Sequence, residues 1–184
     1  MKKIFLSILV LALTVTTHAQ DKYFTKSGKI SFFSKSTLEN IEAHNKSITC
    51  VLDTKSGALQ FAVLMKGFEF EKALMQEHFN ENYVESHKFP KAEFKGSVVN
   101  NNEIDYSKDG TYKAKVKGKL TLHGETRDVE TNGTITVKGG KIDADASFNV
   151  LLADYNITIP SVVKDNISKS INITVDCILD PLKG

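Results

Sequence analysis

The sequence is poor in several residue types, and each shortage excludes a class of protein. Its 184 residues include no tryptophan, three prolines and two cysteines. So few prolines and cysteines exclude a proline-rich linker chain and a small domain held together by several disulfides. A nucleic-acid-binding protein normally keeps a basic surplus, but here 24 Lys and Arg nearly balance 22 Asp and Glu. With 41% hydrophobic residues, the chain has enough apolar side chains for one globular domain.

Long apolar runs are also scarce, and the one clear example lies at the N-terminus. It extends from Ile4 to Val15, which is shorter than the roughly 20 residues that span a bilayer. Two lysines precede it, and the small-x-small sequence Thr17-His18-Ala19 follows it, as in a secretory signal peptide. We therefore expect residues 1–19 to be a signal peptide cleaved near Ala19, and residues 20–184 to be one periplasmic or secreted domain. Loss of the two lysines leaves 22 basic residues against 22 acidic ones.

Most of the remaining chain alternates between apolar and polar residues, which predicts strands with one dry face. The clearest example runs from Tyr112 to His123, where Lys113, Lys115, Lys117 and Lys119 occupy the polar face. The same period marks 129–137 and 142–150, and Gly139-Gly140 between them predicts a hairpin turn. Further strands are predicted at 29–33, 41–53, 58–65, 92–99 and 171–179.

About eight strands with one apolar face each predict an all-β protein. The apolar face of each strand must be buried, and exposed strand edges promote aggregation, so a closed barrel or a sandwich is expected. Two short helices are predicted, one at Phe70–Phe79 from its apolar spacing and one at Ser161–Ser168 after a proline. The predicted inner face mixes small residues with phenylalanines. This composition fits either a solid core or a lumen that holds one elongated ligand.

The two cysteines, Cys50 and Cys177, both fall on the apolar face of predicted strands. Two buried free thiols are one interpretation, since free cysteine is often buried. A disulfide is the other, because an exported protein meets an oxidising environment. Their wide separation and the lack of a nearby histidine pair do not suggest a metal site.

The segment Leu120 to Val129, LTLHGETRDV, resembles the L-T-(L/I)-x-G-x-T-(K/R)-x-V signature of the YceI-like family. The resemblance extends to HFNENYVESHKFPKAEFKG at 78–96, and the C-terminal stretch FNVLLADYNITIPSVVKDNISKSINITVDC is similar to that of members from the Bacteroidetes lineage. Together these segments cover nearly the whole predicted mature chain.

The resemblance implies an eight-stranded antiparallel lipocalin-like barrel, exported to the periplasm, that holds a long isoprenoid or other apolar lipid in its lumen. It implies no cofactor and no catalytic residue, and because some members are dimeric it leaves a homodimer open. The family's ligand contacts are spread over the lumen, so strand parity selects the candidates here. These are Ile30, Phe32, Leu59, Phe61, Val63, Phe94, Val116, Leu120, Leu122, Ile135, Phe148, Val150 and Ile173.

Other residues offer weaker hypotheses. The lysine stripe at Lys113, Lys115, Lys117 and Lys119 is expected to be a solvated outer face, with transient contact to a membrane surface as the alternative. His123 is expected to be exposed or to support a turn beside Gly124. An enzyme acting on a lipid would have to use His78 with Glu77 and Glu81, which more commonly form a solvated helix face. An envelope stress or interaction protein with a filled barrel is the remaining alternative to a carrier.

Overall fold

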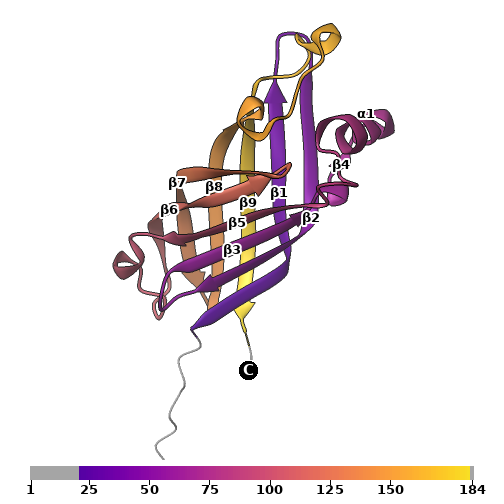
Figure 1. Ribbon diagram of the computed structural model, residues 1–184. Helices are drawn as coiled ribbons and strands as arrows, with labels where there is room; N and C mark the ends of the chain where they lie inside the picture. The colour runs from indigo at the N-terminus through magenta and orange to yellow at the C-terminus, as the bar shows by residue number, and fades with distance from the viewer. Residues whose placement is uncertain (1–20, 183–184) are drawn as a thin grey trace, which may run out of the picture.

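The computed structural model describes residues 21–182, so the predicted signal peptide at 1–19 lies outside the described residues. Nine strands form one antiparallel sheet, and eight of them close into a barrel (Figure 1). Closure comes from pairing of the first strand with both the second and the last. The barrel strands are β1 (Lys22–Lys35), β2 (Asn40–Asp53), β3 (Ala58–Leu64), β5 (Lys91–Val98), β6 (Gly110–Leu122), β7 (Glu125–Lys138), β8 (Lys141–Leu151) and β9 (Ser170–Pro181).

This architecture confirms the predicted all-β, eight-stranded antiparallel barrel. Side chains alternate between the lumen and solvent along the strands, which is why a hydrophobic period of two marks the barrel strands outside the first part of β1. Gly139 and Gly140 form the predicted two-residue turn between β7 and β8, with φ of 57° and 78°. Both values lie in the left-handed region that a tight hairpin turn of this kind requires and that glycine adopts without strain.

The ends of the barrel differ. At the end where the described chain begins and stops, the wholly buried side chains of Ile48, Leu52, Ile142 and Leu179 form a solid core. The opposite end carries the β1–β2 connection and the long β8–β9 connection (Figure 1). The β8–β9 connection includes the 3-10 turns η4 (Leu152–Tyr155) and η5 (Ser161–Val163).

The segment between β3 and β5 packs beside this second end. It contains the 3-10 turn η1 (Met65–Gly67), the short strand β4 (Glu69–Phe70), helix α1 (Ala73–His78) and the π-helical turn η2 (Phe79–Tyr83). β4 pairs only with β2, where Ala43 lies opposite Phe70. Further small turns include η3 (Asn101–Glu103) between β5 and β6.

The prediction of two short helices is half right. α1 and η2 occupy most of the predicted Phe70–Phe79 segment and extend beyond it. The segment predicted at Ser161–Ser168 forms only the single turn η5, so that prediction is wrong. The turn begins after Pro160, but β-branched Val162 and Val163 favour helix poorly and no apolar stripe continues after them.

Candidate binding cavity

A cavity of about 370 Å³ occupies the barrel interior, and its wall is almost entirely apolar. Its size lies in the range of roughly 300–1,000 Å³ that is usual for small-molecule pockets. All barrel strands contribute to it, because each one directs every second side chain inward. The cavity extends from the solid core at Leu52 and Leu179 to the segments at the second end, where Glu39, Met75 and Val163 line it.

The structure places all thirteen lumen candidates on the wall of this cavity. Four of them, Leu59, Val63, Ile135 and Val150, are buried, whereas the other nine are only partly buried although they face inward. An inward side chain that keeps accessible surface borders unfilled space. The lumen is therefore hollow rather than packed solid, and contact of these residues with a ligand stays a prediction.

A pair of glycines shapes one side of the wall. Gly96 of β5 lies directly opposite Gly118 of β6. A Cβ at Gly118 would lie 2.6 Å from both the Phe94 ring and the Lys95 carbonyl oxygen. The absence of side chains thus lets the end of the Phe94 ring lie over the two glycines, and the ring packs edge-on against Phe61 with 6.2 Å between centroids. Phe61 and Phe94 both line the cavity.

Strand parity missed the lining residues that come from the connecting segments. Phe68, Phe70 and Phe79 surround Phe32 of β1, with ring centroids 5.4 to 5.6 Å from it. This aromatic cluster covers the cavity near the second end of the barrel. The parity rule for strands does not apply to turns and short helices. The alternation of Phe68 and Phe70 nevertheless indicated two apolar side chains on one side of the chain, and both line the cavity. Further lining residues from these segments are Met65, Tyr83, Val84, Ile157 and Ile167.

Polar groups at the second end are paired with one another. The Lys72 ammonium donates to Glu39 at 3.0 Å, and this bond, with a smaller contribution from Asn166, holds the pKa of the Glu39 carboxyl below its usual range. The buried Ser34 hydroxyl oxygen accepts a hydrogen bond from the backbone N–H of Ser168 at 2.9 Å. These bonds connect the β1–β2 connection to the residue that precedes α1, and the end of β1 to the β8–β9 connection.

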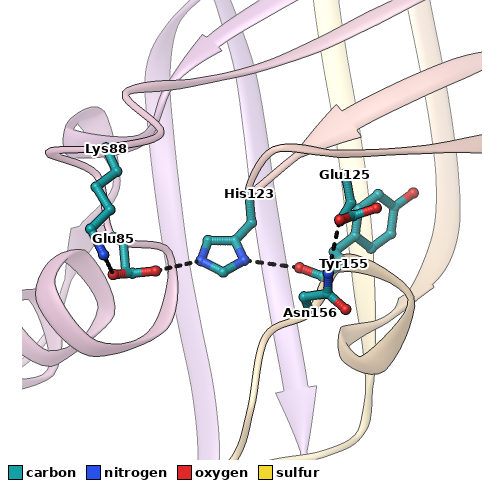
Figure 2. Close-up of polar contacts among 6 residues, drawn as sticks. All are labelled: Glu85, Lys88, His123, Glu125, Tyr155 and Asn156. Atoms are coloured by element: carbon teal, nitrogen blue, oxygen red, sulfur yellow. Dashed lines mark hydrogen bonds and ion pairs between the residues drawn. The ribbon is translucent and has the colours of Figure 1, made fainter.

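A second polar network fixes three turns that carry lining residues (Figure 2). His123 Nδ1 lies 2.9 Å from the Tyr155 carbonyl oxygen, and His123 Nε2 lies 3.1 Å from Glu85 Oε2. Lys88 donates to the other Glu85 oxygen, and Asn156 donates to Glu125 at 2.8 Å. The neighbouring residues Tyr83, Val84, Leu152 and Ile157 all line the cavity, so the network holds part of its wall.

His123 begins the β6–β7 turn, as expected, but it is not exposed. Its side chain is 10% exposed, and the Phe89 ring packs edge-on against it at 4.6 Å. The expectation of an exposed side chain assumed that the alternation of β6 continues to the turn. The φ of 51° at His123 ends this alternation and directs the ring toward the Tyr155 and Glu85 segments. Within residues 21–182, the three non-glycine residues with positive φ are Glu85, His123 and Asn156, and all three belong to this network.

Cys50 and Cys177 are fully buried and stand as free thiols. A hydrogen bond with Cys177, together with burial, raises the pKa of the Cys50 thiol well above its usual range. The two cysteines lie on β2 and β9, on either side of β1. Gly28 of β1 permits their approach, since a Cβ there would lie 2.6 Å from Cys177 Sγ.

The remaining candidates lie on the outer barrel wall or at the edge of the cavity. Within the lysine stripe, Lys117 pairs with Glu130 at 2.9 Å and Lys119 pairs with Asp128 at 2.9 Å on the outer barrel wall. Glu77, His78 and Glu81 are exposed; His78 is among the residues that line the cavity, and its Nδ1 lies 3.1 Å from the Asn82 side-chain oxygen.

Within the described part of the chain, one carboxylate cluster meets metal-ligand spacing. It consists of Asp143, Asp145 and Asp176, whose oxygens lie within 4.8 Å of one another on the outer wall of β8 and β9. Burial, and then repulsion between neighbouring carboxylates, raises the pKa of both Asp143 and Asp145. Lys29 lies 3.7 Å from Asp176. Across residues 21–182, no helix is both long and apolar enough to cross a membrane.

Comparison with known proteins adds to this geometry. No curated protein gives a significant match. A polyisoprenoid binding domain from Saccharophagus degradans, described as implicated in plant cell wall breakdown, superposes with a TM-score of 0.75 at 12% identity, over 89% of this chain and 100% of that one. BcnA from Burkholderia cenocepacia gives 0.67 at 18% identity, over 83% and 95% of the two chains. The Campylobacter jejuni YceI protein gives 0.62 at 17% identity, over 81% and 90%.

At such identities, the likeness to these structures shows a shared fold. The family assignment depends instead on the sequence, because the model of the YceI-like domain family matches residues 13–179. This match covers most of the chain and includes every barrel strand at least in part. The chain therefore belongs to the YceI-like domain family.

Proposed function

We propose that this protein is an exported carrier that holds a long apolar lipid, of isoprenoid type, in the barrel lumen. The observation that carries the proposal is the hollow interior, in which nine inward-facing apolar residues remain only partly buried. The name of the Saccharophagus domain, which has the same fold, states that it binds polyisoprenoid. The pattern of residues 1–19 supports export.

Transfer of the lipid's hydrocarbon chain from water into the apolar lumen supplies the binding affinity. Each buried CH₂ group contributes about 0.8 kcal/mol, so a chain of ten or more carbons gains several kcal/mol beyond the cost of its ordering. The wall provides few polar groups, and those at the second end already pair with one another. Recognition therefore depends on the width and length of the lumen rather than on a headgroup. The same almost entirely apolar wall favours a binding protein over an enzyme.

The test is native mass spectrometry of protein purified from the periplasm without detergent, followed by lipid extraction. We expect an added mass that corresponds to an isoprenoid lipid. Delipidated protein should then bind a polyprenol more tightly than a saturated fatty alcohol of equal length. A bare mass that persists after incubation with either lipid would contradict the proposal and favour a filled-barrel interaction protein.

Two variants on one strand control for the site of binding. Val116 of β6 faces the lumen, and its neighbour Lys115 is exposed on the outer wall. Val116→Trp should reduce polyprenol binding at least tenfold, because the indole fills the lumen. Lys115→Trp should leave binding unchanged. Equal binding by both variants would show that the lipid lies elsewhere.

A further inference from the structure

Three large apolar side chains project into solvent at the second end of the barrel. Leu38 is 70% exposed on the β1–β2 connection, Leu74 is 62% exposed on α1, and Val162 is 88% exposed on η5. An isolated exposed apolar residue needs no explanation, but three on separate segments around one opening indicate an interaction surface. We call these three residues the rim.

The rim segments are joined around the cavity opening. Lys72, which precedes α1, pairs with Glu39 next to Leu38. Thr37 on the other side of Leu38 donates to the Asp165 carbonyl oxygen at 3.5 Å. Each rim residue also has an immediate sequence neighbour that lines the cavity, namely Glu39, Met75 or Val163. The rim residues therefore adjoin the cavity wall in the chain, and the β1–β2 and β8–β9 connections lie together at this end in Figure 1.

Charge on these segments identifies the partner. Lys35, Lys164 and Lys169 are exposed, and among residues 21–182 no carboxylate lies within 4 Å of their ammonium groups. On the same two connections Glu39 is neutralised by Lys72, which leaves Asp154 and Asp165 as the opposing charges. The acidic Glu71 and Glu77 lie on the α1 side. With Lys35 at the end of β1, the β1–β2 and β8–β9 connections thus combine three lysines, set against two aspartates, with projecting apolar tips.

We propose that the rim docks on an anionic lipid bilayer, with Leu38 and Val162 inserted among the acyl chains and Lys35, Lys164 and Lys169 against the headgroups. This inference rests on the proposed carrier function and adds the surface through which the lipid enters and leaves. Single apolar side chains on turn tips, with lysines two or three residues away in the chain, suit a fluid interface better than a protein partner, which needs a contiguous patch of about 800 Å². A docked rim would let a hydrocarbon chain pass between bilayer and lumen without crossing water.

The absence of tryptophan from the sequence permits a direct test. Leu38→Trp places the sole indole of the protein at the rim, and Ile178→Trp places it on the outer wall of β9, at a residue that is 53% exposed. With vesicles that contain phosphatidylglycerol, the emission of the Leu38→Trp variant should shift to the blue, and that of the Ile178→Trp variant should not. Equal behaviour of the two variants would overturn the proposal.

Vesicle sedimentation, which needs no introduced tryptophan, provides a second measurement. The double variant Leu38→Ser with Val162→Ser should bind the vesicles at least tenfold more weakly than the wild-type protein, and Ile178→Ser should bind as the wild type does. Replacement of phosphatidylglycerol by phosphatidylcholine, or addition of salt, should weaken vesicle binding, because either change reduces the attraction between the lysines and the lipid headgroups. Retention of full binding by the double variant would contradict docking through the rim.

The two proposals fail in different ways. If the rim variants lose no vesicle binding while polyprenol still fills the lumen, docking through the rim is wrong and the carrier function stands. If Leu38→Trp inserts into vesicles while no polyprenol binds, the carrier function is wrong and the rim is a membrane anchor for another purpose.

Discussion

His123 and Glu85, which lie 38 positions apart in the sequence, meet with 3.1 Å between Nε2 and Oε2. The other ring nitrogen faces the Tyr155 carbonyl oxygen, which only accepts hydrogen bonds. An ionised carboxylate also only accepts, so both partners are satisfied when both ring nitrogens carry protons. The His123 ring thereby joins the turn after β6 to the segments that carry Glu85 and Tyr155.

Acid should weaken this network through Glu85. Hydrogen bonds from Lys88 and then from His123 hold the pKa of the Glu85 carboxyl below its ordinary value of 4.5. A carboxyl with a lower pKa in the folded state stabilises the protein at neutral pH, and this contribution is lost as pH falls through the folded-state pKa. We expect Glu85→Gln to lower the melting temperature at pH 7 and to flatten its decline below pH 4.5. Glu81→Gln, at an exposed residue of η2, is the control and should change neither.

The positive φ of His123 predicts which substitutions at this position destabilise the protein more. Asparagine adopts a φ near 51° more readily than a β-branched residue does. We therefore expect His123→Val to destabilise the protein more than His123→Asn, by about 1–3 kcal/mol in urea unfolding. Equal losses would mean that the ring contacts alone account for the effect and that the turn carries no strain.

The contact between Cys50 and Cys177 predicts a thiol count. Because both thiols are buried and the pKa of Cys50 is raised, neither should react with a disulfide reagent in the folded protein. After unfolding without reductant, two thiols should react, as free cysteines require. A count of zero in protein from the periplasm would instead demonstrate the alternative, a disulfide between β2 and β9.

The glycine pair under Phe94 predicts a link between stability and lumen shape. Gly118→Ala places a methyl group against the Lys95 carbonyl oxygen and the Phe94 ring, so it should cost about 1–3 kcal/mol of unfolding free energy and weaken polyprenol binding. Gly110→Ala is the matched control on the same strand. Its Cβ would meet the Tyr112 side chain at 3.2 Å, which has room to move. Similar losses for both variants would show that any alanine in β6 has this effect.

Hydrophobic period predicted the barrel strands because successive residues of a strand face opposite sides of the sheet. The same rule placed all thirteen lumen candidates on the cavity wall. It failed for the first part of β1, where the register with β2 shifts between Thr25 and Ile30 and the alternation is interrupted. It also failed at His123, where a left-handed turn residue ends the alternation.

The sequence by itself thus determined the strands, their inner faces and the family, since each depends on local period or on a contiguous motif. Only the tertiary structure decided that the lumen is hollow, because unfilled space depends on how eight strands and the β3–β5 segment pack together. It also decided that Leu38, Leu74 and Val162 are exposed and that Cys50 and Cys177 meet across Gly28. The two cysteines are far apart in the chain, and closure of the barrel, not any local pattern, brings them together.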